Sequence, residues 1–152
     1  MTLKSVVTTL LGKLTQNPLQ KNQEVVQPTP YELIGGEQGV RKLANRFYDI
    51  MQNDDSAKEL LAIHPQPMLA IRQKFFEYLS GWLGGPALYE SKYGHPRLRA
   101  RHLPYYINSQ MRDQWMYCMN LAMDDVIEHP ELKQSLRDAF YQLASHMMNQ
   151  EN

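Results

Sequence analysis

One short segment of the chain, residues 96–104, combines residue types that bind metals and acids. A proline closes it at each end, three arginines stand at alternate positions, and a histidine, His102, follows the last of them. The arginines are Arg97, Arg99 and Arg101. Because proline is tolerated in the first turn of a helix but not in its interior, the segment has room for about two helical turns. A neutral imidazole binds transition metals, haem iron among them, and guanidinium groups pair with carboxylates.

This segment therefore favours the binding of a metal-containing cofactor that carries acid groups. The alternative is a surface turn whose arginines form a solvated basic face. The two interpretations differ in whether the rest of the chain supplies the walls of a pocket.

Two polar aromatic side chains lie on stripes that otherwise consist of apolar residues. Tyr48 falls on the apolar face of a helix predicted over 37–53, and Trp115 falls in the middle of one predicted over 109–128. Each brings a hydrogen-bond donor that needs a partner when it is buried. One interpretation is two core aromatics bonded to backbone carbonyls. The other is a pocket wall that points donors at a ligand.

The elements that must position these residues are helices, because apolar residues recur at helical spacing through the body of the chain. The pattern predicts an all-α domain of five helices. They are expected at 37–53, from a cap within Asn53–Ser56 to about Ile63, at 67–83, at 109–128, and from Pro130 along an apolar face that reaches Met147. Gly84-Gly85-Pro86 ends the third helix, and Asn108 or Ser109 caps the fourth. An irregular connection that contains segment 96–104 separates these two helices.

Residues 1–30 are expected to form an N-terminal extension, and residues 31–152 to form the domain. Residues 1–16 carry apolar positions at helical spacing, which predicts a short, weakly amphipathic helix. Asn17-Pro18 interrupts this pattern, and the stretch from Gln20 to Pro30 has the prolines and the missing periodicity of a linker.

Composition excludes several classes of partner. The chain has 16 Lys and Arg against 16 Asp and Glu, so its charge gives no basis for binding nucleic acid or an anionic membrane. The one cysteine, Cys118, excludes an intramolecular disulfide and is expected to be a small buried residue in a reducing compartment. No secretory signal or spanning segment is recognised, which predicts a cytoplasmic location. Small ligands are the expected partners.

Several motifs occur in an order that is typical of one known family. They are Gly35-Gly36, Phe47-Tyr48, Gly84-Gly85-Pro86, the run from Tyr93 to His102, and Asp113-Gln114-Trp115 followed by Cys118-Met119. Over residues 31–149 the chain resembles the truncated haemoglobins of bacteria, specifically group II. The run that ends at His102 is the most specific part of the resemblance.

The resemblance implies a truncated globin, a two-over-two helical sandwich around haem b (iron protoporphyrin IX), with His102 as the proximal ligand of the iron. It also implies that Tyr48 and Trp115 line the distal side, where an O–H and an N–H donor stabilise polarised dioxygen. His64 aligns with a distal position as well. The haem pocket is expected to include Phe47, Ile71, Phe75, Leu79 and Met111. The propionates are expected to meet Arg101, Arg99 and Tyr93, although each of these three could instead face water.

His64 has two interpretations. It adds a third donor or orders a water beside Tyr48, or, because it precedes Pro65, it only terminates a turn. Ile71 and Phe75 are bulky and cannot donate, so a wide ligand entry path is not expected on their side. For a six-coordinate iron, the sixth ligand would have to be His64 or, in the ferric state, Tyr48. The remaining histidines, expected to be structural or surface residues, are His95, His129 and His146.

The predicted function is reversible binding of dioxygen, nitric oxide and other diatomic ligands at haem iron. The number of donors around the ligand favours slow release and redox chemistry, such as nitric oxide dioxygenation or peroxide turnover. An unidentified reductase is then expected as a partner. The alternatives are a non-catalytic oxygen carrier or gas sensor, and a helical interaction protein without haem. No residue is assigned a certain catalytic role.

Overall fold

The computed structural model describes residues 26–152, and every regular element in that range is a helix. The long helices are α3 (Gly36–Asn53), α5 (Leu69–Trp82), α8 (Ser109–Val126) and α9 (Pro130–His146). The short elements are α2 (Pro30–Ile34), the 3-10 helix η1 (Asp55–Ala57), α4 (Lys58–Ala62), α6 (Leu88–Tyr93) and α7 (Leu98–His102). The all-α class predicted from the sequence is confirmed. The helix predicted over residues 1–16 lies outside the described residues.

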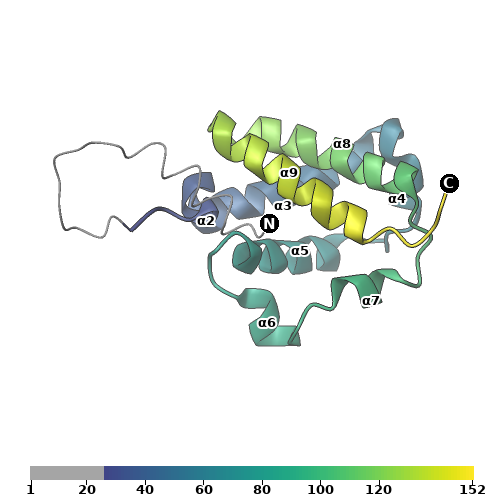
Figure 1. The fold of residues 1–152 in the computed structure, drawn as a ribbon, viewed down its shortest axis with the longest axis horizontal. Coiled ribbons are helices and arrows are strands. Elements are labelled where there is room, and N and C mark those ends of the chain that lie inside the picture. The colour runs from purple at the N-terminus through teal and green to yellow at the C-terminus, as the bar shows by residue number, and fades with distance from the viewer. Residues whose placement is uncertain (1–25) are drawn as a thin grey trace.

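The four long helices form two pairs. α3 packs against α5 in one pair and α8 packs against α9 in the other, and α3 also packs along α8. Figure 1 shows α8 and α9 on one side of α5, with α6 and α7 on its other side. α5 therefore separates the packed core from the segment that carries His102. Within residues 26–152, no helix has the length and apolar character needed to cross a membrane.

Local signals set the ends of the long helices. The side-chain oxygen of Asn108 accepts a hydrogen bond from the backbone N–H of Met111, which caps the start of α8. Nδ1 of His129 accepts one from the backbone N–H of Leu132 and caps α9. α5 ends before Gly84, whose φ of +92° lies in the left-handed region that favours glycine. The predicted bounds of α5 and α8 are confirmed within two residues.

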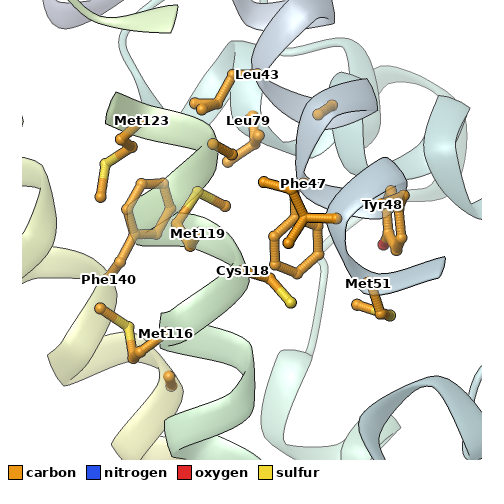
Figure 2. Close-up of a cluster of buried hydrophobic side chains, with 14 of the residues drawn as sticks. Leu43, Phe47, Tyr48, Met51, Leu79, Met116, Cys118, Met119, Met123 and Phe140 are labelled. Carbon is orange, nitrogen blue, oxygen red and sulfur yellow. The ribbon is translucent and has the colours of Figure 1, made fainter. Parts of the chain in front are cut away.

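The core lies where α3, α8 and α9 meet. Figure 2 shows the methionines of α8 and Phe140 of α9 gathered opposite Leu43 and Phe47 of α3. Side chains with no exposed surface in this cluster include Leu43, Phe47, Met51, Met119, Met123 and Phe140. Methionine is unbranched and fills irregular gaps, so α8 adapts its surface to the aromatic rings around it. This core is the rigid support behind Tyr48 and Trp115.

The expectation of five helices is incomplete, because the structure contains two further short helices, α2 and α6. α2 is fixed by a capping box, in which Thr29 and Glu32 each accept a hydrogen bond from the other's backbone N–H. α6 contributes one buried side chain, Tyr89. Helices of five or six residues are too short to show a period, and tertiary contacts decide whether they form.

α7 is held at the edge of the domain by polar contacts to the C-terminal segment. None of the residues Leu98–His102 is buried. Nη1 of Arg99 donates to the backbone carbonyls of His146 and Met148, at 2.5 and 3.2 Å. The side-chain amide of Asn149 donates to the last carbonyl of α7 at 3.1 Å. The short helix that the flanking prolines predict is confirmed, and it ends at its histidine.

Candidate functional site

His102, the last residue of α7, has a half-buried ring. Its Nδ1 lies 2.6 Å from the carbonyl oxygen of Leu98, one turn earlier. Because a carbonyl oxygen only accepts, this contact assigns the ring hydrogen to Nδ1 and leaves the lone pair of Nε2 free. Metal-binding histidines are commonly oriented in this way by a hydrogen bond from their other nitrogen. The residue predicted to bind iron thus has a ring nitrogen, Nε2, whose lone pair is available to a metal.

One face of α5 carries large side chains that the protein covers only in part. Its residues, called the α5 face below, are Ile71, Phe75, Tyr78 and Trp82, and all are half-buried. Their spacing of four, three and four residues places them on one side of a helix. The adjoining positions are almost completely buried: Phe76, Leu79, Ser80 and Leu83. α5 therefore has one face in the core and a second apolar face that the chain does not close.

Apolar side chains from other elements are half-buried in the same manner. They are Leu98 of α7, Trp115 of α8, Leu143 of α9 and Met148 after α9. Incompletely covered apolar surface with a few convergent polar groups is typical of a ligand site. Haem is a large, mostly apolar group that would need such walls and a protein ligand for its iron. The residues present, together with Nε2 of His102, therefore fit a haem group.

An aromatic cluster surrounds Tyr48. The Tyr48 ring lies edge-on to Phe47, Phe75 and His64, with centroid distances of 4.9, 5.7 and 5.9 Å. Trp115 joins the cluster through Phe47 at 5.1 Å and Phe75 at 6.3 Å. The structure thus brings together the three polar residues that the sequence predicts on the distal side, with two phenylalanines between them.

Tyr48 is held in the form that donates a hydrogen bond. Its side chain is 4% exposed, and this burial raises the pKa of the phenol well above its ordinary value. The positive charge of Arg72, whose guanidinium carbon lies 5.7 Å from the ring centroid, offsets part of that effect on the pKa. The phenol therefore keeps its hydrogen at neutral pH.

His64 is held in a neutral form. Its Nδ1 lies 2.8 Å from the carbonyl oxygen of Leu60, which assigns the ring hydrogen to Nδ1. Burial lowers the pKa of His64, the Leu60 hydrogen bond opposes this, and the charge of His102 lowers the pKa further. Nε2 of His64 thus offers a lone pair rather than a hydrogen. This geometry favours the alternative in which His64 orders a water or binds a metal over the one in which it acts as a third donor.

The three residues expected at the propionates are not equivalent. Nη1 of Arg99 bonds two backbone carbonyls, so Arg99 anchors α7 to the C-terminal segment. Arg101 is exposed, and its guanidinium carbon lies 6.0 Å from the ring centroid of Tyr89. Tyr93 is 41% exposed, and its ring lies at a tilt to that of Tyr89, with the centroids 4.8 Å apart. Arg101 and Tyr93 therefore share an aromatic neighbour, while Arg99 has partners of its own.

The other expected pocket residues divide between the core and the α5 face. Phe47 and Leu79 have no exposed surface, and Met111 is 7% exposed, whereas Ile71 and Phe75 belong to the α5 face. Sequence reasoning did not assign five half-buried residues to the pocket: Tyr78, Trp82, Leu98, Leu143 and Met148. Tyr78 continues the spacing of Ile71 and Phe75, which is a signal that could have found it. Met148 follows the end of α9 and has no such pattern.

The remaining histidines and the cysteine have structural surroundings. His95 accepts a hydrogen bond from the backbone N–H of Arg97, His129 caps α9, and His146 is exposed at the end of α9. Cys118 is fully buried, which raises the pKa of its thiol to about 12. The expectation that Cys118 is a small buried residue is confirmed.

Comparison with known proteins identifies a set of similar chains. A profile of the bacterial-like globin family matches residues 29–149. The cold-adapted truncated haemoglobin of the Antarctic marine bacterium Pseudoalteromonas haloplanktis is 57% identical, with a TM-score of 0.80 over 81% of this chain and 99% of that one. The group II 2-on-2 haemoglobin of the plant pathogen Agrobacterium tumefaciens is 40% identical, with a TM-score of 0.81 over 86% and 100%.

A third similar structure is the truncated oxygen-avid haemoglobin of Bacillus subtilis. It is 37% identical, with a TM-score of 0.72 over 80% of this chain and 100% of that one. Two of these structures are described as truncated haemoglobins, and the Agrobacterium tumefaciens structure is described as a group II 2-on-2 haemoglobin. The two-over-two arrangement predicted from the sequence is confirmed.

Proposed function

Since the chain belongs to the bacterial-like globin family and is a group II truncated haemoglobin, we propose that it supports redox chemistry, such as nitric oxide dioxygenation or peroxide turnover. The family makes the chain a haem-based protein that binds oxygen or related ligands. We also propose that the protein binds dioxygen, nitric oxide and other diatomic ligands reversibly, and that its cofactor is haem b.

His102 is proposed as the protein ligand of the iron, through Nε2. When bound, haem supplies an iron that coordinates diatomic ligands. The α5 face and Leu98 offer the apolar walls that exclude water from this group. Arg101 and Tyr93 are proposed to meet the propionates, because a guanidinium and a phenol both donate to carboxylates. Arg99 supports them by fixing α7 to the C-terminal segment.

The observation that carries the proposal is the cluster in which Tyr48 and Trp115 lie against the aromatic rings of Phe47 and Phe75. Burial keeps the Tyr48 phenol protonated, so it donates to any polar ligand that reaches it. A hydrogen bond to a charged group is worth about 1.5–3 kcal/mol, or about one to two decades in an equilibrium constant. Two such donors favour retention of a ligand over rapid delivery. Nε2 of neutral His64 is proposed to order a water beside Tyr48.

Redox turnover requires a source of electrons, so the proposal includes a reductase partner that is not yet identified. The single buried thiol, Cys118, fits a reducing compartment, and a cytoplasmic location is proposed on that ground.

Oxygen release and nitric oxide consumption test the proposal. We expect slow oxygen release from the wild type, about 10- to 100-fold faster release from Tyr48→Phe and from Trp115→Phe, and consumption of nitric oxide by the oxygenated wild type. Tyr117→Phe is the matched control, because Tyr117 is 39% exposed and its phenol donates to Asp54 outside the cluster. Fast release without turnover of nitric oxide or peroxide contradicts the proposal and indicates a carrier or a sensor.

A further inference from the structure

Gln114 of α8 joins its own helix to α4 through both ends of its side-chain amide. Its Oε1 accepts a hydrogen bond from the backbone N–H of Leu60 at 3.0 Å, and its Nε2 donates to Oε2 of Glu59 at 2.7 Å. Both partners belong to α4, which packs against α8 (Figure 1). No role assigned above uses this side chain.

α4 needs such support because it does not cap itself. Ala57, the residue at its N-cap, has no side-chain atom that accepts a hydrogen bond, and a helix of five residues is too short to be stable by itself. The N–H of Leu60, the third residue of the helix, is one of the groups that an N-cap side chain normally satisfies. Gln114 satisfies it instead, although the two residues are 54 apart in the sequence.

The same residue of α4 also holds His64. The carbonyl oxygen of Leu60 lies 2.8 Å from Nδ1 of His64, and the Leu60 side chain is buried. Two hydrogen bonds therefore join Gln114 to His64 through the backbone of Leu60. Because the first fixes Leu60 relative to α8 and the second fixes the ring relative to Leu60, a shift of α4 against α8 moves the ring.

The His64 ring lies at the proposed ligand site. Its centroid is 5.9 Å from that of Tyr48, whose side chain is buried. Trp115 follows Gln114 directly in α8 and joins the same cluster through Phe47. α8 thus carries one residue of the cluster itself and fixes the place of a second one through Gln114.

We propose that Gln114 is a positioning residue of the ligand site: by holding α4 at Leu60, it keeps His64 where its Nε2 orders a water beside Tyr48. The inference rests on the proposed function and adds to it a residue that acts through His64. Without the Gln114 amide, α4 loses its cap, His64 moves relative to Tyr48, and a bound diatomic ligand is released faster.

Amide hydrogen exchange tests the positioning step without any measurement of ligand binding. In Gln114→Met, which keeps the length of the side chain but not its amide, the Leu60 N–H should exchange faster than in the wild type. The double variant Glu59→Gln/Gln114→Glu exchanges donor and acceptor, so both hydrogen bonds can form again and slow exchange should return. Gln110→Met is the matched control, because Gln110 is exposed one turn earlier on α8, and it should exchange like the wild type.

A double-mutant cycle with His64→Leu tests the functional step. We expect Gln114→Met to speed oxygen release about 2- to 10-fold and to shift the infrared C–O stretch of the carbon monoxide-bound protein, because the surroundings of the ligand change. In the His64→Leu background, Gln114→Met should change neither quantity further. The exchanged double variant should return both quantities toward the wild type, and Gln110→Met should leave both unchanged.

Two results would overturn the proposal: wild-type exchange of the Leu60 amide in Gln114→Met, or an effect of that variant on the C–O stretch that is equally large without His64. A Gln114 with only a structural role would lower the free energy of unfolding but show no such coupling. Failure of the proposed function is a separate result, in which the wild type releases oxygen fast and turns over neither nitric oxide nor peroxide. In that case the C–O stretch still decides whether Gln114 acts through His64.

Discussion

The core where α3, α8 and α9 meet and the α7 segment differ in how they are held in place. The core consists of interlocking apolar side chains with no exposed surface, such as Phe47, Met119 and Phe140. α7 has no buried residue and is fixed mainly by hydrogen bonds from Arg99 and Asn149. The core therefore sets the positions of Tyr48 and Trp115 rigidly. The segment that carries the proposed iron ligand depends on a few polar contacts and, once bound, on the cofactor itself.

The largest effect that tests this difference is expected from a cavity in the core. Met119→Ala should lower the free energy of unfolding by about 2–5 kcal/mol, because a fully buried side chain is removed and the helices around it cannot close the space. Leu98→Ala in α7 should lower it by about 1 kcal/mol or less, because Leu98 is only half-buried. Equilibrium unfolding in guanidinium chloride measures both. Equal losses would show that α7 is part of the core.

A second, smaller effect concerns the contacts that hold α7. The Asn149 side chain donates to the carbonyls of His102 and Tyr105 and accepts from the backbone N–H of Ile107. Asn149→Ala should lower the free energy of unfolding by about 1–2 kcal/mol and speed haem loss to an acceptor protein. Gln142→Ala, at an exposed position of α9, is the control and should change neither quantity. Haem loss at the wild-type rate in Asn149→Ala would show that these contacts do not hold the segment.

A modest gain in stability is expected at the start of α7. Arg97 has a φ of +46°, in the left-handed region that costs most residues energy. Asparagine tolerates this conformation, so Arg97→Asn should raise the free energy of unfolding by about 0.5–1 kcal/mol. Arg97→Val, which is branched at Cβ, should lower it. Thermal unfolding of the two variants compares them directly, and the opposite order would contradict the backbone argument.

The smallest effect is a pH dependence of stability that arises from His64, in the aromatic cluster around Tyr48. The pKa of His64 is lowered in the folded protein, mainly by burial, so the unfolded chain binds a proton at a higher pH than the folded one. The free energy of unfolding should therefore keep its full value above the ordinary histidine pKa of about 6.5 and decrease as the pH falls below it. His64→Gln should lose less stability over the same interval. Parallel unfolding curves at pH values above and below that pKa measure the difference, and identical losses would contradict it.

The same difference between core and α7 explains what the sequence could predict. Periodicity identifies α3, α5, α8 and α9 because each buries a stripe long enough to repeat. It places Tyr48 and Trp115 correctly on two of those stripes. The prolines around His102 similarly limit α7 to a short helix.

Other features depend on contacts between distant parts of the chain, and periodicity does not report them. α6 is too short for a pattern, and the carbonyl partners of Arg99 lie at the end of α9. The ring hydrogens of His64 and His102 are assigned by carbonyls that only the folded helices bring into position. Tyr78 is different, because its spacing from Ile71 and Phe75 was readable in the sequence.

The most direct measurement of the central claim is the absorbance spectrum of haem-loaded wild type beside that of His102→Ala, in ferric, ferrous and carbon monoxide-bound states. The account predicts a histidine-ligated haem in the wild type, loss of that ligation in His102→Ala, and its recovery when free imidazole is added. If His102→Ala binds haem with the same axial ligation as the wild type, then His102 is not the iron ligand and the account is contradicted.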